Sequence, residues 1–198
     1  MSEPDPSDED LLRRMMAGDE DAFTALYRRR QAGVYRFALQ MSGSQAIAED
    51  VTQEVFLTLM REARGYEPAR GSLAAYLYGI ARHQVLGCLR RQRPETSLAA
   101  SAEPLEASDD PLGDLTRRQS IDAVRRAVLA LPAHYREAVV LCDLHEMNYA
   151  DAAAALGCAV GTVRSRLHRA RELLAARLGA LHPAGAARPV TSPARCLI

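Results

Sequence analysis

Arginine gives this sequence its clearest chemical capacity, and arginines gather in one short stretch, VGTVRSRLHRAR at residues 160–171. At helical spacing the apolar residues share one side: Val160, Val163, Leu167, Ala170 and, one turn on, Leu174. The polar side chains are left to face outward: Arg164, Ser165, His168, Arg169 and Arg171. Such a helix is suited to lie against a polyanion, although a solvated surface helix would show the same pattern.

The residues just upstream favour the first of these interpretations. Residues 149–159 form a short alanine-rich segment, in which Gly157 is placed to end a helix in the left-handed conformation. A helix-turn-helix needs a small residue where its helices touch, a glycine in the turn and a β-branched residue on the second helix. Ala153, Gly157 and Val163 meet these needs. The pattern predicts DNA binding rather than a purely structural hairpin.

Composition favours helices over sheet. The 198 residues allow one large or two small domains, tryptophan is absent, and alanine, leucine and arginine are abundant. The net charge of zero hides an asymmetry between segments. The first 21 residues carry eight acidic side chains against two arginines, whereas residues 160–177 carry five arginines and one glutamate.

Several function classes find no support in the sequence. The four cysteines are widely spaced, which argues against a disulfide framework or a zinc site. His145-Glu146 begins like a zinc-protease motif, but Tyr149 stands where the second histidine must be. We therefore expect no enzyme activity, catalytic residue, metal or cofactor. Without a signal peptide or a long apolar run, the expected location is the cytoplasm, with no membrane insertion.

The breaks in apolar periodicity divide the chain into four parts. Four helices, closing at Arg93, predict an N-terminal domain over residues 1–93. Residues 94–113 contain prolines and five acids and no base, which predicts a flexible acidic linker. Residues 114–180 form a second helical block that contains the helix-turn-helix, with Pro132 at the N1 position of one helix. Residues 181–198 are expected to be a disordered tail.

Three segments carry a resemblance to a known family. Residues 48–57 (AEDVTQEVFL) resemble the most recognisable segment of bacterial sigma-70-type sigma factors, residues 79–91 resemble the helix that follows it, and residues 131–174 resemble their helix-turn-helix domain. With only these two domains, the chain is most similar to the extracytoplasmic-function group. The resemblance implies an all-α fold: a region 2-like four-helix domain, then the acidic linker, then a region 4-like domain.

The resemblance also implies partners. They are core RNA polymerase, through its β′ clamp and β subunit, promoter DNA and an anti-sigma factor. The polymerase-binding residues that it implies are Asp50, Gln53, Glu54 and Phe56. The first three project from one polar side of a helix, and an acidic face suits a basic protein surface better than DNA.

By the same resemblance, the loop at residues 64–71 and the next helix capture the −10 promoter element as single-stranded DNA. The cationic and aromatic side chains suited to this are Arg64, Tyr66, Arg70, Arg82, His83, Arg90 and Arg91. Tyr76 is expected to be structural. His83 and Gly87 depart from the asparagine and aspartate common in the family, which bears on the −10 preference.

The second helix of the helix-turn-helix is then expected to enter the major groove at the −35 element. The implied contacts are Arg136, Thr162, Arg164, Ser165, His168, Arg169 and Arg171. Arg164, Ser165, His168 and Arg169 are expected at base edges, and Arg136 at the DNA backbone. Arg171 is expected to contact phosphate or to form a pair within its own domain. The alternative function is a self-standing helix-turn-helix regulator that forms no holoenzyme.

Overall fold

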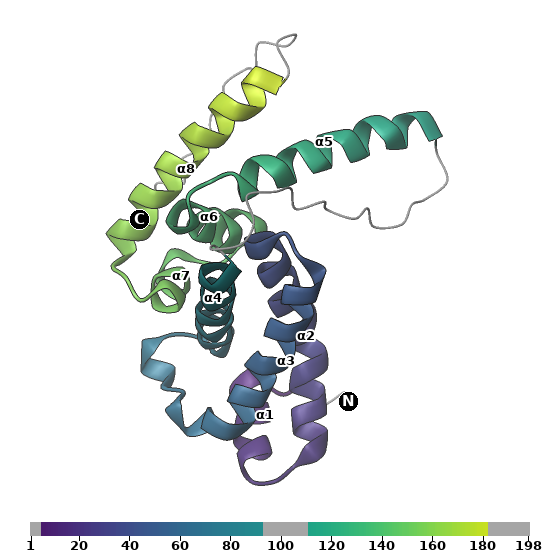
Figure 1. The fold of residues 1–198 in the computed structure, drawn as a ribbon. Coiled ribbons are helices and arrows are strands. Elements are labelled where there is room, and N and C mark those ends of the chain that lie inside the picture. The colour runs from purple at the N-terminus through teal and green to yellow at the C-terminus, as the bar shows by residue number, and fades with distance from the viewer. Residues whose placement is uncertain (1–4, 93–110, 182–198) are drawn as a thin grey trace.

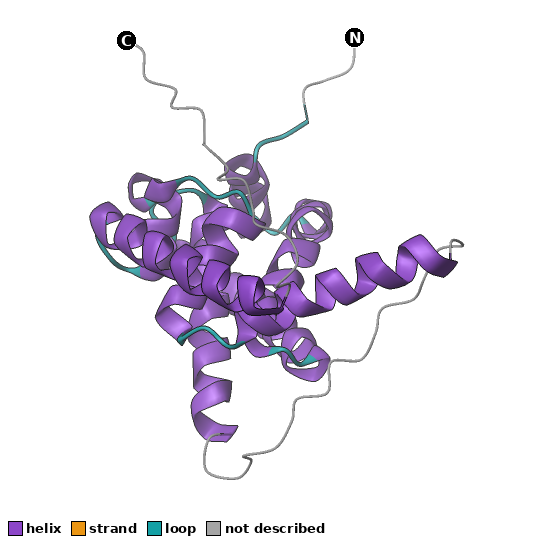
Figure 2. Cartoon of the chain, turned by 90° about the horizontal axis from the view of Figure 1, so that it is seen from above, coloured by secondary structure: helices purple, strands orange, loops and turns teal. Residues whose placement is uncertain are grey.

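The computed structural model of the chain describes residues 5–92 and 111–181 (Figure 1). This part consists of helices and loops, with no strand within it (Figure 2), so the predicted all-α class is confirmed. The α-helices are α1 (Asp8–Met16), α2 (Glu20–Ser42), α3 (Gln45–Glu62), α4 (Leu73–Gln92), α5 (Pro111–Leu129), α6 (Ala133–Val139), α7 (Tyr149–Leu156) and α8 (Val160–Leu181). Two 3-10 turns, η1 (Ala63–Gly65) and η2 (Pro68–Arg70), and a π-helical turn, η3 (Val140–Leu144), complete the described elements.

Side-chain caps determine where the first three helices begin. Ser7, Asp19 and Ser44 occupy the N-cap positions of α1, α2 and α3, and each accepts a hydrogen bond from the N–H three residues on. Gly43 ends α2 with φ of 73°, a left-handed conformation that costs glycine little. Helices α1 to α4 form the N-terminal block, which contains the four helices predicted before residue 93.

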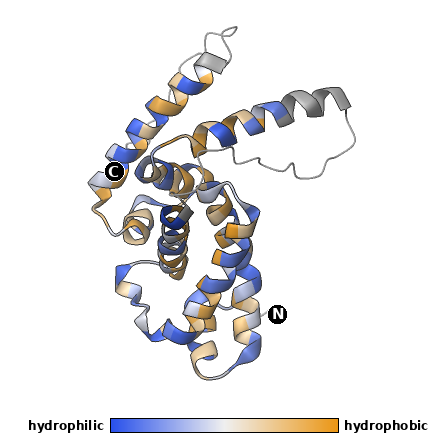
Figure 3. Cartoon of the chain, in the orientation of Figure 1, coloured by the Kyte–Doolittle hydropathy of each residue, from blue (hydrophilic) through white to orange (hydrophobic). Residues whose placement is uncertain are grey.

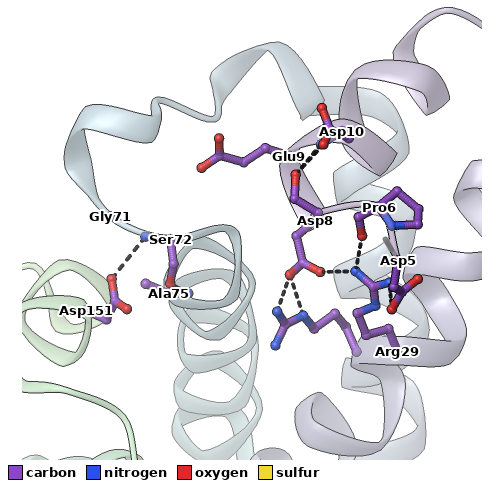
Figure 4. Close-up of polar contacts among 12 residues, drawn as sticks. Asp5, Pro6, Asp8, Glu9, Asp10, Arg29, Gly71, Ser72, Ala75 and Asp151 are labelled. Atoms are coloured by element: carbon purple, nitrogen blue, oxygen red, sulfur yellow. Dashed lines mark hydrogen bonds and ion pairs between the residues drawn. The ribbon is translucent and has the colours of Figure 1, made fainter. Parts of the chain in front are cut away.

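The N-terminal segment is tied to α2 by a partly buried carboxylate. Asp8 pairs with both Arg29, at 3.0 Å, and Arg30, whose Nε donates to it at 2.6 Å (Figure 4). Asp5 adds a second carboxylate to Arg29 at 2.7 Å. The acidic charge that the sequence places at its start thus neutralises two arginines of α2.

The C-terminal block, α5 to α8, differs from the prediction at two helix starts. Helix α5 begins at Pro111, three residues before the predicted Asp114, consistent with the preference of proline for the first helical position. Pro132 is the N-cap of α6 rather than its N1 residue, because its ψ of 141° is extended rather than helical. Glu146, with φ of 53°, then turns the chain from η3 toward the helix-turn-helix.

The two blocks contact each other, chiefly where α7 packs along α4 (Figure 1). At the start of α4, the N–H of Ser72 donates to Oδ1 of Asp151 on α7 at 3.0 Å (Figure 4). The predicted flexible linker falls mostly on residues 93–110 and the predicted tail on residues 182–198, and both ranges lie outside the described residues. The division into domains at these boundaries stays a prediction.

Candidate nucleic-acid interfaces

Helix α8 presents the predicted arginine face, because its apolar side is held by neighbouring helices. Val163, Leu167 and Ala170 are almost fully buried against α6 and α7, and hydrophobic and hydrophilic positions alternate along the helix (Figure 3). Gly157, with φ of 62°, ends α7 as predicted. Arg164, Ser165, His168, Arg169 and Arg171 are exposed, and Thr162 is half-buried.

The exposed side chains of α8 make mostly local contacts. The Arg164 guanidinium lies over the Tyr149 ring, 5.6 Å from its centroid. Arg169 donates to Glu172 at 2.8 Å, and this hydrogen bond lowers the pKa of Glu172. His168 lies 3.4 Å from the same carboxylate. Exposed ion pairs of this kind contribute little to the stability of the fold. Arg164 and Arg169 are therefore accessible to a stronger anion.

Arg171 is engaged within its own block. Its Nε and Nη2 atoms donate to the two carboxylate oxygens of Asp143 on η3, at 3.1 and 2.6 Å. These bonds raise the pKa of the Arg171 guanidinium. Arg171 was expected either to contact DNA phosphate or to form a pair within its own domain. The structure contains the pair with Asp143, which joins α8 to η3.

Arg136 makes its contacts inside the protein, which does not fit its predicted contact with the DNA backbone. It reaches into the junction between blocks and donates to three backbone carbonyls, those of Met41, Leu129 and, at 3.0 Å, Leu131. Burial lowers the pKa of its guanidinium. The residue joins α2 to α5 and α6, a role that depends on a long-range contact and leaves no mark in the local sequence.

The loop between α3 and α4 borders a cavity of about 650 Å³. Tyr66 and Arg70 from the predicted −10 set line it, and so do Tyr76 and His83 of α4. Arg64 is exposed at the same loop but does not line the cavity. The lining carries mixed charge, since Glu54, Arg61, Glu62 and Glu67 contribute as well. Arg61, in the last turn of α3, is a cation outside the predicted set, although it lies only three residues before Arg64 of η1.

Hydrogen bonds hold the two tyrosine rings at this cavity. The Tyr66 hydroxyl donates to Glu9 at 3.2 Å or to the Gly71 carbonyl at 3.3 Å, and Tyr76 donates to the Glu62 carbonyl at 3.4 Å. The ring centroids are 5.7 Å apart, and burial raises the pKa of both hydroxyls. Tyr76 is thus anchored as expected of a structural residue, and it also lines the cavity.

Helix α4 carries the remaining −10 candidates, which differ in their exposure to solvent. His83 is exposed at the cavity, and Arg90 and Arg91 are exposed near the end of the helix. Arg82 is partly buried, and its Nε donates to Glu137 of α6 at 2.9 Å. In this arrangement the Arg82 side chain faces the C-terminal block and is 27% exposed.

Helix α3 presents a face of mixed character to solvent. Asp50 and Gln53 are exposed as predicted, and Glu54 is half-buried, 3.8 Å from Arg61. Phe56 is only 3% exposed and packs edge-on against Tyr27 at 4.7 Å, which corrects its prediction as a polymerase contact.

Two large apolar side chains of α3 outside the predicted set are also exposed, Leu57 at 42% and Met60 at 57%. They follow Gln53 at intervals of four and seven residues, so they lie on its side of the helix. Their spacing could have identified them, because large apolar side chains at such positions indicate an interaction surface. In the described part of the chain, none of the helices has the length and apolar character that crossing a membrane requires.

Comparison with known families matches both blocks. The sigma-70 region 2 family matches residues 26–95 and the sigma-70 region 4 family matches residues 121–174. The ECF RNA polymerase sigma factor SigE of Mycolicibacterium smegmatis is 35% identical over 179 residues, covering 86% of this chain and 68% of SigE. SigM of Mycobacterium tuberculosis is 36% identical over 179 residues, covering 89% of this chain and 87% of SigM.

Solved structures show the same fold. CnrH, in complex with the cytosolic domain of CnrY, gives a TM-score of 0.67 at 24% identity, covering 87% of this chain and 97% of CnrH. The sigma factor RpoE of Bartonella quintana, in complex with the anti-sigma factor NepR, gives a TM-score of 0.64 at 26% identity. That match covers 79% of this chain and 96% of RpoE.

Proposed function

The chain belongs to the extracytoplasmic-function group of the sigma-70 family, and on this premise we propose how it divides the promoter between its two blocks. As a sigma factor it directs promoter-specific transcription by RNA polymerase. In our proposal α8 binds the −35 element as duplex, and the loop at residues 63–72 with α4 binds the −10 element as single strand. Residues 1–93 and 114–180 act as the two domains, joined by residues 94–113.

The observation that carries the −35 assignment is the division of α8 into two sides. One side is fixed by Val163, Leu167 and Ala170, so the helix can enter a groove as a rigid rod. The other side offers Arg164 and Arg169 with only exposed, local partners. Arginine can bind guanine through two parallel hydrogen bonds, so these residues suit base reading better than phosphate contact alone. Ser165 and His168 complete the base-facing set.

The −10 assignment is supported by the cavity beside α4. A flipped base needs a pocket and an aromatic face, which Tyr66 and Tyr76 provide, and its backbone needs nearby cations. Arg61, Arg64 and Arg70 lie on or beside the cavity rim, and Arg90 and Arg91 extend the basic surface along α4. His83 lines the cavity, so it is the residue that we expect to contact the base or its neighbour.

For polymerase we propose the exposed face of α3. Asp50 and Gln53 supply the polar contacts, and Leu57 and Met60 supply the apolar centre that a stable protein interface needs. Phe56 supports this face from beneath rather than touching the partner. The predicted partner surface is the β′ clamp, with the β subunit a further contact of the complete protein.

We further propose an anti-sigma factor as a partner and the cytoplasm as the location, with no catalytic reaction of the chain's own. One structural neighbour supports the first point, because RpoE is described in complex with the anti-sigma factor NepR. RNA polymerase and promoter DNA, as working partners, require the cytoplasm.

The deciding experiment is in vitro transcription with purified core polymerase and a library of randomised promoters. We expect this chain and core alone to initiate from promoters that share two elements. The double variant Arg164→Ala, Arg169→Ala should lose the upstream preference while keeping the downstream one. DNA binding without initiation would instead identify a self-standing regulator.

A further inference from the structure

A second, smaller pocket lies between the middle of α2 and the start of α4, and its volume is about 150 Å³. Three arginines of α2 line it, Arg29, Arg30 and Arg36, together with Tyr78 of α4. None of the described residues that line it is acidic, and none of them lines the cavity assigned to the −10 element. A water molecule in the liquid takes up about 30 Å³, so the pocket has room for a larger anion.

Helical spacing and one glycine bring these side chains together. Arg29 and Arg36 are seven residues apart, so two turns of α2 place them on one side, with Gly33 between them. A Cβ built on Gly33 would stand 2.8 Å from the Tyr78 hydroxyl oxygen, so glycine here lets α4 approach α2 closely. Burial raises the pKa of Tyr78, and the charges of Arg30 and Arg36 oppose that rise. Both guanidinium groups therefore lie near the same hydroxyl.

The three arginines differ in how far carboxylates neutralise them. Arg29 pairs with Asp8 at 3.0 Å and with Asp5 at 2.7 Å (Figure 4). Arg30 donates through Nε to the same Asp8 carboxylate at 2.6 Å. Arg36 is exposed and has neither a hydrogen bond nor an ion pair within the part of the chain that the structure describes. Two carboxylates thus face three arginines, which leaves one positive charge.

The neighbours of Arg36 on the other elements cannot supply the missing charge. Arg36 lies near enough to His145 to lower its pKa, which burial already brings to about 4, so this imidazole is neutral at pH 7. His145 is 2.9 Å from the Tyr78 hydroxyl and 2.9 Å from Oε1 of Gln40, and both of these groups are neutral as well. A guanidinium held beside neutral walls and open to solvent is suited to an anion from outside the chain.

We propose that the pocket between α2 and α4 binds a phosphate group through Arg36 and Arg30. The planar guanidinium donates two parallel hydrogen bonds, which match two oxygens of a phosphate. This chemistry can come from a small phosphorylated molecule or from a phosphate of the DNA backbone. Asp8 competes for Arg30, so the acidic N-terminal segment limits the affinity. The inference does not depend on the −10 and −35 assignments, because neither set contains these arginines.

The first test is isothermal titration calorimetry of the full-length chain with inorganic pyrophosphate at constant ionic strength. Arg36→Gln should weaken binding at least about tenfold, because it removes charge-assisted hydrogen bonds. Asp8→Asn should tighten binding, because it releases Arg30. Arg28→Gln is the matched control, since Arg28 is exposed on the same helix and carries the same charge but does not line the pocket. It should change the affinity by less than about twofold, because salt screens exposed charges.

The second test titrates the same proteins with single-stranded and duplex oligonucleotides of random sequence, because backbone contacts do not depend on sequence. Pyrophosphate binding that Arg36→Gln abolishes identifies a small phosphorylated ligand. If pyrophosphate does not bind, but Arg36→Gln weakens DNA binding more than Arg28→Gln does and lowers the salt slope by about one, the backbone supplies the phosphate. Equal behaviour of folded Arg36→Gln and Arg28→Gln proteins with both probes would overturn the proposal, and so would the absence of saturable binding to either probe.

Discussion

At the scale of single residues, Arg136 and Arg164 show how burial changes the role of one side-chain type. Both lie in the C-terminal block, and the sequence analysis placed both at the −35 element. Arg136 donates hydrogen bonds to backbone carbonyls inside the protein, whereas the Arg164 guanidinium lies over the exposed ring of Tyr149. Sequence patterns located the arginines of α8 because a helix period reveals a face, but no period reveals a side chain that crosses to another block.

Alanine substitution of Arg136 should therefore affect stability, whereas alanine substitution of Arg164 should affect DNA binding. Arg136→Ala should lower the free energy of unfolding by about 2–5 kcal/mol, because it leaves buried carbonyls without donors. Arg164→Ala should leave stability nearly unchanged, cost about 1–3 kcal/mol in binding to the selected −35 duplex, and relax preference at one base. Thermal unfolding and fluorescence anisotropy measure the two quantities. Unchanged −35 binding in both Arg164→Ala and Arg169→Ala would refute the base-edge assignment.

His145 predicts a pH dependence of stability. Burial, with a smaller contribution from the nearby Arg36, lowers the pKa of His145 to about 4. The unfolded chain therefore binds this proton more readily, so stability is full above about pH 6.5 and declines as the pH falls toward 4. The slope should reach up to about 1.4 kcal/mol per pH unit. Urea unfolding between pH 7 and 5 measures it, and His145→Gln, which cannot titrate, should flatten the curve.

From the sequence, His145 drew notice only as the first residue of an incomplete zinc-protease motif, and its buried position in the protein was not predicted. Its partners explain this, since Tyr78 and Gln40 lie 67 and 105 residues away along the chain. A lone histidine next to a turn gives no local sign of such partners.

At the scale of elements, helix ends were largely predictable and helix faces less so. Ser7, Asp19, Ser44 and Gly43 delimit α1 to α3 through local cap geometry, which the sequence expresses directly. The buried side of α3 was not as clear, because Phe56 and Leu57 are adjacent and apolar and only one can face the core. Tyr27 packs against Phe56, and this contact settles which one.

The same helix predicts a separation of stability from polymerase binding. Leu57→Ala and Met60→Ala should each weaken binding to core polymerase by more than about 1 kcal/mol, while leaving the unfolding transition nearly in place. Phe56→Ala should instead cost about 3–5 kcal/mol of stability, because it opens a cavity beside Tyr27. Titration of labelled protein with core, alongside calorimetry, distinguishes the two. Wild-type core affinity in the Leu57 and Met60 variants would exclude this face.

At the scale of the whole molecule, the contact between blocks was not predictable from sequence. The patterns describe each block separately, and Ser72 and Asp151 are 79 residues apart. The small residues that permit the contact, such as Gly79 beside Ala155, also occur in ordinary helices. The sequence led us to predict two domains joined by an acidic linker. It did not lead us to predict that the two blocks pack against each other.

The length of the connection gives a further prediction. Residues 93–110 separate α4 from α5 and can span at most about 60 Å. Deleting residues 96–104 removes about 30 Å of that reach, so transcription from promoters with both elements should fall strongly. Replacing the same nine residues with glycine and serine keeps the reach and should preserve transcription. Run-off assays with promoters of different spacing measure the effect, and full activity of the deletion variant would argue against simultaneous binding of both elements.

The local character of the contacts around the α8 side chains has a consequence for evolution. Arg164, Ser165, His168 and Arg169 touch Tyr149, Thr162 and Glu172, but none of them supports the buried side of the helix. Their replacement therefore carries little risk of misfolding, so under the proposed −35 role gene duplicates can diverge in promoter choice through a few substitutions. The same tolerance makes these four positions suitable for randomisation when an orthogonal transcription system is built on this scaffold.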